Sequence, residues 1–168
     1  MAIPESVRCN WSRDTGLLII RLGLGIAMML HGWPKITGGM ALWGQLGLAM
    51  GNFGITFAPV AWGLAAACTE FFGGLLLAIG LCFRLSAFIL VIQMTVATVF
   101  HVSAGDGFPV FSHALELGLV FLGLLLTGPG QYSLDSRYCR CRSGRLWQEG
   151  RGSCRCSCTC CRSCCSSC

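Results

Sequence analysis

Four long apolar segments, separated by short polar or glycine-rich stretches, dominate the hydropathy pattern of the chain. They cover about residues 16–32, 57–81, 85–102 and 112–126, and the fourth can start as early as Pro109 or Val110. A helix rises about 1.5 Å per residue, so roughly 20 apolar residues cross the hydrocarbon of a bilayer. The pattern therefore predicts four membrane-spanning helices.

The links between these segments predict how the helices are arranged. The second and third segments are joined only by the turn Cys82–Arg84, which forces an antiparallel hairpin. Pro34 is expected to disturb or end the first helix. The glycine-rich stretch 35–58 has apolar residues at helical spacing, which are Met40, Trp43, Leu46 and Met50. It predicts a short interfacial helix, with a re-entrant loop as the alternative.

Composition supports an all-α integral membrane four-helix bundle. Of the 168 residues, 54% are hydrophobic and only 11% are charged, whereas a soluble domain carries about 25% charged residues. One membrane domain is expected over residues 16–135. It follows a polar segment, residues 1–15, and precedes a cysteine- and arginine-rich tail, residues 136–168, which is expected to be disordered.

The positions of the basic residues predict the orientation in the membrane. The side that would hold both termini carries Arg8, Arg13, Arg21, Arg84 and seven arginines from Arg137 to Arg162. The other side carries only Lys35. By the positive-inside rule, both termini are cytoplasmic. The net charge of +5 lacks the aromatic-interleaved basic groove of a nucleic-acid site, so a lipid bilayer is the expected environment and no nucleic acid is expected as a partner.

Polar residues inside the apolar segments are the candidate functional residues. Counted along each helix, Glu70 and Glu116 come at roughly 18 Å and 16 Å from the cytoplasmic side, and Gln93 at about 13 Å. His31, His101 and His113 come at about 20–25 Å. An ionisable residue inside a membrane is expensive and usually functional. We expect these groups to converge in one pocket in the outer half of the bundle.

Each of these residues also has a structural interpretation. The histidines can lie at the outer membrane interface, where imidazole is solvated, and Glu116 can face a water-filled vestibule. Arg21 can extend its side chain to the inner interface or pair with Glu70. The set as a whole favours a site, because two acids and Gln93 at mid-depth cannot all be interface residues.

The chemistry of this set suits the polar head of a membrane quinone, which needs hydrogen-bonding and proton-exchanging groups beside an apolar slot. The residues expected to act catalytically are Glu70, Glu116, His31 and His113. Those expected to bind the cofactor are Arg21, Gln93, His101 and Trp33. The sequence has no haem-attachment C-x-x-C-H, dinucleotide fingerprint or iron–sulfur spacing. The electron donor would then be a partner protein or a small reductant.

Three sequence stretches resemble the DoxX family of bacterial membrane proteins. They are RLGLGIAMMLHGWPKI, AACTEFFGGLLLAIGLCFRLSAFIL and LELGLVFLGLLLTGPGQYSLD, within about residues 15–135. The resemblance implies a four-helix bundle in the cytoplasmic membrane and a redox setting, since relatives include the membrane subunit of a thiosulfate:quinone oxidoreductase and proteins linked to thiol and oxidative-stress systems. The polar residues that match the family are Arg21, His31, Lys35, Glu70 and Arg84.

The tail departs from the family pattern because ten of the thirteen cysteines fall in residues 139–168. Thiolates at such spacings bind soft metals, and the candidate ligands are Cys154, Cys156, Cys158, Cys160 and Cys161. The predicted cytoplasmic side keeps thiols reduced. A shifted reading frame through GC-rich coding sequence would give the same composition, so the metal site and the artefact both stay open.

The sequence favours a redox-linked oxidoreductase subunit and leaves two other classes open. One is a non-enzymatic membrane subunit that docks or stabilises partner enzymes. The other is a small metal or solute transporter, for which four helices would have to oligomerise. Partner proteins or a homo-oligomer are expected in each case.

Overall fold

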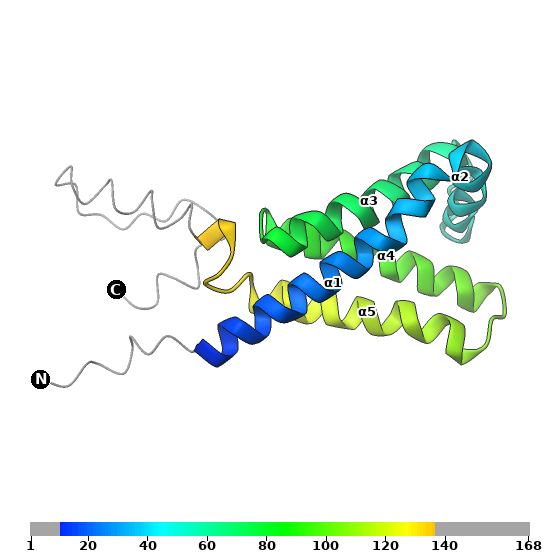
Figure 1. Ribbon diagram of the computed structural model, residues 1–168. Coiled ribbons are helices and arrows are strands. Elements are labelled where there is room, and N and C mark those ends of the chain that lie inside the picture. Colours follow the sequence, from blue (N-terminus) through cyan, green and yellow to red (C-terminus); the bar gives the residue numbers. More distant parts are fainter. Residues whose placement is uncertain (1–10, 137–168) are drawn as a thin grey trace, which may run out of the picture.

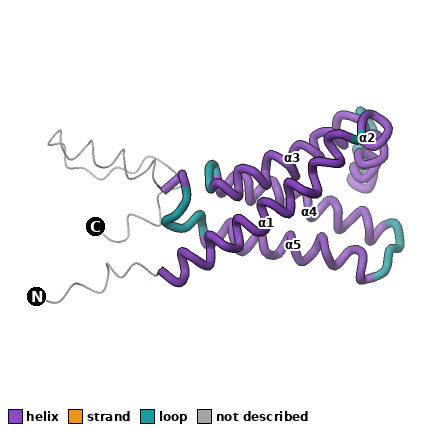
Figure 2. Tube along the Cα trace, in the orientation of Figure 1, coloured by secondary structure: helices purple, strands orange, loops and turns teal. Residues whose placement is uncertain are grey.

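The computed structural model describes residues 11–136, and every regular element in this part of the chain is a helix (Figures 1 and 2). The elements in chain order are α1 (Trp11–Thr37), α2 (Gly39–Gly47), the 3₁₀ helix η2 (Leu48–Phe53), α3 (Pro59–Ile79), α4 (Phe83–Ser103) and α5 (Phe108–Thr127). Of these, α1, α3, α4 and α5 are long and apolar enough to cross a membrane. The predicted all-α fold with four spans is confirmed.

The four spans pack as two long pairs joined by a hairpin. Helix α1 lies along α3, α4 lies along α5, and α3 contacts α4. The chain enters α1 at the end of the bundle where α5 finishes, which we call the terminal end (Figure 1). The opposite end, where α2 lies, is called the α2 end.

Glycines allow α1 and α3 to come into backbone contact. A Cβ added at Gly25 would lie 2.6 Å from the carbonyl oxygen of Gly74, and one added at Gly32 would lie 2.6 Å from the backbone nitrogen of Phe71. Both distances are too short for a real side chain, so only glycine fits at this crossing. The contact holds the part of α3 around Phe71 and Gly74 directly against the second half of α1.

The predicted short helix between the first two spans is confirmed as α2, which packs on the first turns of α3. A Cβ at Gly47 would collide with Pro59, and one at Gly63 would collide with the backbone of Trp43. The Trp43 indole nitrogen also donates a 2.8 Å hydrogen bond to the carbonyl of Lys35. These contacts fix α2 and the end of α1 against the same helix.

Pro34 was expected to disturb or end α1, and it does not end it, because the helix continues to Thr37. Proline lacks an N–H, so it removes one backbone hydrogen bond from the helix interior. Pro34 lies three residues before the helix end, where the last turn is also held by the Thr37 hydroxyl, which donates 3.1 Å to the Trp33 carbonyl. The extra turn keeps Lys35 within the bundle.

Candidate functional site

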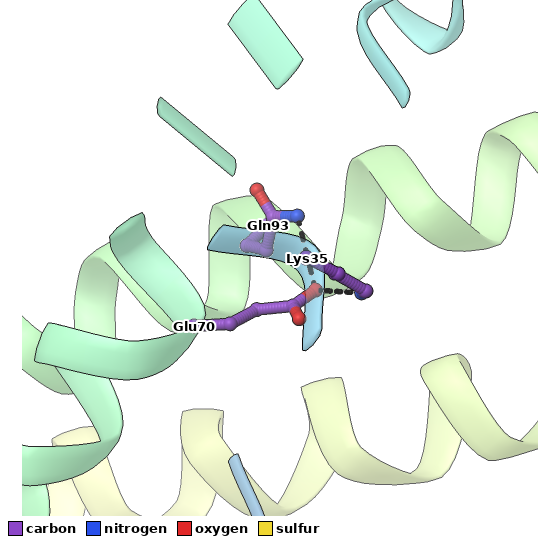
Figure 3. A network of polar contacts seen from close by, with 3 residues as sticks. All are labelled: Lys35, Glu70 and Gln93. Carbon is purple, nitrogen blue, oxygen red and sulfur yellow. Dashed lines mark hydrogen bonds and ion pairs between the residues drawn. The ribbon is translucent and has the colours of Figure 1, made fainter. Parts of the chain in front are cut away.

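Glu70 is the centre of a polar network that joins three of the four spans. The Lys35 amine on α1 lies 2.6 Å from Glu70 Oε1 on α3. The Gln93 amide on α4 donates a longer hydrogen bond of 3.4 Å to the same oxygen. Figure 3 shows the three side chains converging on this oxygen. We call these three residues the Glu70 network.

The burial of Glu70 makes this network unusual for a membrane span. Glu70 is 3% exposed, and a charged group inside a bilayer is unfavourable by at least about 2.5 kcal/mol on insertion scales. Lys35 compensates that charge at short range. The second oxygen, Oε2, is buried and has no hydrogen-bond partner among residues 11–136. A buried carboxylate oxygen without a donor is available to a ligand donor or to a proton.

The network reaches the protein surface through Lys35, whose side chain is 32% exposed. His31 lies one helical turn before Lys35 on α1, so the two share a face. The His31 ring is 6.0 Å from the His113 ring on α5, centroid to centroid. Both histidines are exposed. The two imidazoles therefore lie next to each other between α1 and α5, on the face of α1 where the Lys35 side chain is partly exposed.

The structure does not bring Glu116 to the Glu70 network. Glu116 on α5 is exposed, and no hydrogen bond or ion pair joins it to another residue of the described chain. Counting residues along a helix gives the depth of a side chain but not the direction in which it points. Glu116 has the expected depth, yet α5 turns it outward.

Two further predicted residues lie apart from the network. His101 Nδ1 lies 2.7 Å from the Asp106 carboxylate in the loop after α4, so its partner is local. Trp33 is 57% exposed, and its ring lies 5.7 Å from that of Phe71. This aromatic pair spans α1 and α3 one residue from Glu70 in the chain.

Arg21 serves a different place, at the terminal end. It is 2% exposed, and its guanidinium donates hydrogen bonds to the carbonyls of Pro129, at 3.0 Å, and Tyr132. The alternative that Arg21 pairs with Glu70 is wrong, because Lys35 holds that acid. Arg21 thus fixes the segment that follows α5, residues 128–135, which we call the closing segment.

Asp135 holds the other side of the closing segment. Its carboxylate accepts hydrogen bonds from the backbone nitrogens of Cys82, at 3.0 Å, and Phe83, at 2.9 Å. It therefore caps the N-terminus of α4 from a distant part of the chain. The residues that carried the resemblance at this end have a structural role in tying α1, α4 and α5 together.

Sequence reasoning did not include Lys35 among the site residues. Lys35 was named only as a residue that matches the family and as the lone basic residue on its side of the membrane. The spacing of four residues between His31 and Lys35 is the signal that could have identified it, since a continuous helix puts both on one face.

No metal centre is present among the described residues, where no cluster of three or more histidine, cysteine, aspartate or glutamate side chains occurs. The candidate ligands Cys154, Cys156, Cys158, Cys160 and Cys161 lie outside residues 11–136. The soft-metal site in the tail stays a prediction.

The Glu70 network combines a carboxylate that has a free oxygen with an amine and an amide, and two imidazoles lie on the Lys35 face of α1. The amine, amide and imidazole N–H groups donate hydrogen bonds, whereas the carboxylate accepts them or exchanges a proton.

Comparisons with known proteins agree with this architecture. A sequence model of the DoxX family matches residues 16–103. The chain is 34% identical over 125 residues to the inner membrane protein YqjF of Escherichia coli K12, covering 73% of this chain and 91% of that protein. It is 32% identical over 129 residues to an uncharacterized protein of Haemophilus influenzae, covering 73% and 90%. No solved structure gives a significant match. The chain is a membrane protein and belongs to the DoxX family.

Proposed function

We propose that this protein is the membrane subunit of a redox-linked system and that the Glu70 network binds the polar head of a quinone. The observation that supports this most is the buried Glu70 carboxylate, whose Oε2 has no partner in the described chain. A structural ion pair gains from pairing both oxygens, whereas a free oxygen suits a site that takes and releases a proton.

The network supplies what reduction of a quinone requires. Each quinone carbonyl becomes a hydroxyl, so the reduced head takes up two protons with its two electrons. Lys35 donates a hydrogen bond to one carbonyl and favours the negative charge that develops there. Glu70 passes a proton to the head and is reprotonated from outside the bundle through the His31–His113 pair, and a second round supplies the proton for the other carbonyl. The electrons come from a partner protein or a small reductant.

An aromatic pair offers a second contact surface for a flat ring. The Trp33 and Phe71 rings, on α1 and α3, lie 5.7 Å apart, and aromatic side chains stack on planar ligands. The exposed side of α1 gives a lipid-soluble molecule access without passing through water.

The binding test uses the full chain in lipid nanodiscs with a short-chain ubiquinone as the probe. The wild type binds its reduced form, whose hydroxyl donates a hydrogen bond to Glu70, and Glu70→Gln raises the Kd at least about tenfold because the charged acceptor becomes a neutral amide. Asp106→Asn makes the same acid-to-amide change outside the network and leaves the Kd unchanged. Failure of the wild type to bind, or equal binding by Glu70→Gln, would overturn the proposal. Melting curves of all three proteins establish that each is folded.

We also propose that both termini lie in the cytoplasm and that the protein spans the bacterial inner membrane. Within the described chain, Arg13, Arg21 and Arg84 all lie at the terminal end, whereas Lys35 lies toward the α2 end. Basic residues accumulate on the cytoplasmic side of membrane proteins, which supports this orientation.

A further inference from the structure

The outward face of α5 carries an acid that has no partner in the described chain. Glu116 is exposed and lies eight residues after the start of α5 at Phe108. It is thus roughly 12 Å into the span. Acidic side chains at such depth face a bundle interior, a water-filled cavity or a partner. The fold of a single copy provides none of these for Glu116.

The direction of this face follows from its buried neighbours. Ala114 and Phe121 are 7% and 0% exposed, and they pack in the core against α4. Glu116 and Gly123 each come two residues later, and a two-residue step turns about 200° around a helix. Glu116 and Gly123 therefore point away from the core on a common outer line.

This outer line is complementary to itself. His113 is exposed one turn before Glu116, so the line carries both an acid and an imidazole. Gly123 is exposed and has no atom within 4 Å of an added Cβ, so another helix can approach closely there. Helix α5 also has the smallest buried share of the four spans, 17%.

We propose that a second copy of the chain docks on this face, α5 against α5, with His113 of each copy bonded to Glu116 of the other. We call the face, which consists of His113, Glu116, Val120 and Gly123, the α5 face. A two-fold axis along the membrane normal forms the His113–Glu116 contact twice. The pairing removes the acid from lipid in both copies.

The dimer also adds a group to the imidazole pair described above. His113 lies 6.0 Å from His31, so the second copy brings an acid beside two histidines. The inference does not depend on quinone binding, because it rests on the exposure of Glu116 and the shape of the α5 face.

The test measures association of the full chain in liposomes by energy transfer between two fluorescently tagged pools at several protein-to-lipid ratios. The wild type shows energy transfer, and single-molecule photobleaching of the tagged protein in two steps establishes that the associated species is a dimer. Glu116→Leu and Gly123→Ile each weaken association at least about tenfold. The matched control is Gly23→Ile, since Gly23 on α1 is also exposed and has no atom near an added Cβ. It changes association less than about twofold.

A charge exchange tests the paired residues directly. His113→Glu alone places acids together and abolishes the dimer, whereas His113→Glu combined with Glu116→His restores it. Because Glu116→Leu makes α5 more apolar, a loss of association in this variant cannot be explained by a failure of α5 to insert into the membrane. Circular dichroism checks the helix content of each variant.

Any of four results would overturn the inference. The wild type could stay monomeric at every ratio, Glu116→Leu could associate as strongly as the wild type, or Gly23→Ile could weaken the dimer as much as Gly123→Ile. A structure in which Glu116 contacts a different membrane protein or a bound lipid, with no second copy present, would also exclude the dimer.

Discussion

The Glu70 carboxyl is accommodated inside a membrane span by Lys35, whose amine lies 2.6 Å from one of its oxygens. That contact crosses from α1 to α3 and also attracts the Gln93 amide of α4. The stability of the bundle is therefore coupled to the chemistry of its candidate site.

Removal of Lys35 is expected to destabilise the protein through Glu70. Lys35→Met leaves a buried carboxylate with only an amide partner, which lowers the free energy of unfolding by about 2 kcal/mol, at the low end for buried pairs because Lys35 is partly exposed. Lys35→Met combined with Glu70→Gln recovers most of this loss. Unfolding of both variants and of Glu70→Gln in detergent measures the coupling, and strictly additive losses would contradict it.

The sequence predicted which residues are polar and at what depth, but not which way they face. Glu70 and Gln93 do meet, whereas Glu116 at a similar depth points outward. Packing sets the rotation of a helix about its own axis. A span that is apolar on nearly all sides does not show in its sequence which face is buried. Lys35 was named as a residue that matches the family but not as a site residue, and its contact with Glu70 depends on the continuation of α1 past Pro34.

At the scale of the helices, the α1–α3 contact depends on glycine at particular positions. Gly32→Ala would place a Cβ 2.6 Å from the Phe71 nitrogen and force the helices apart, which lowers the free energy of unfolding by about 1–3 kcal/mol. Gly23 on the same helix has open space around it, so Gly23→Ala is neutral or gains up to about 1 kcal/mol from helix propensity. Melting temperatures of the two variants compare these outcomes, and equal effects would exclude a specific contact at Gly32.

The start of α4 depends on a carboxylate from the closing segment. Asp135→Ala removes the acceptor for the Cys82 and Phe83 backbone nitrogens and lowers the free energy of unfolding by about 1–2 kcal/mol. Hydrogen exchange of the first turn of α4 also becomes faster. Asp106→Ala is the control at the opposite end, where a partly exposed pair with His101 contributes about 1 kcal/mol or less. Unchanged exchange in Asp135→Ala would show that the cap is dispensable.

The spans themselves were predictable because length and apolarity are local properties. The closing segment was not, since Arg21 bonds residues more than a hundred positions later. A contact between backbone carbonyls and a distant guanidinium leaves no periodic pattern in the sequence. The sequence shows that an arginine lies in the first span, but it does not show that the carbonyls of Pro129 and Tyr132 accept its hydrogen bonds.

For the whole molecule, orientation is the property that reporters can measure. With both termini cytoplasmic, a green fluorescent protein fused after residue 168 fluoresces, and alkaline phosphatase fused there is inactive because it needs the oxidising periplasm. Phosphatase inserted at residue 105, in the loop between α4 and α5, is active instead. The reverse pattern would show that the arginines do not set the orientation.

The closing segment also makes the order of synthesis matter. Arg21 is made early and enters the membrane with α1, yet the carbonyls that accept its hydrogen bonds belong to residues translated after all four spans. Until the ribosome has released them, a buried guanidinium and the uncapped start of α4 lack partners, and such groups are costly in a low-dielectric setting. A chain truncated before Pro129 would insert its four spans but lack both sets of contacts, which would make it a substrate for membrane proteases.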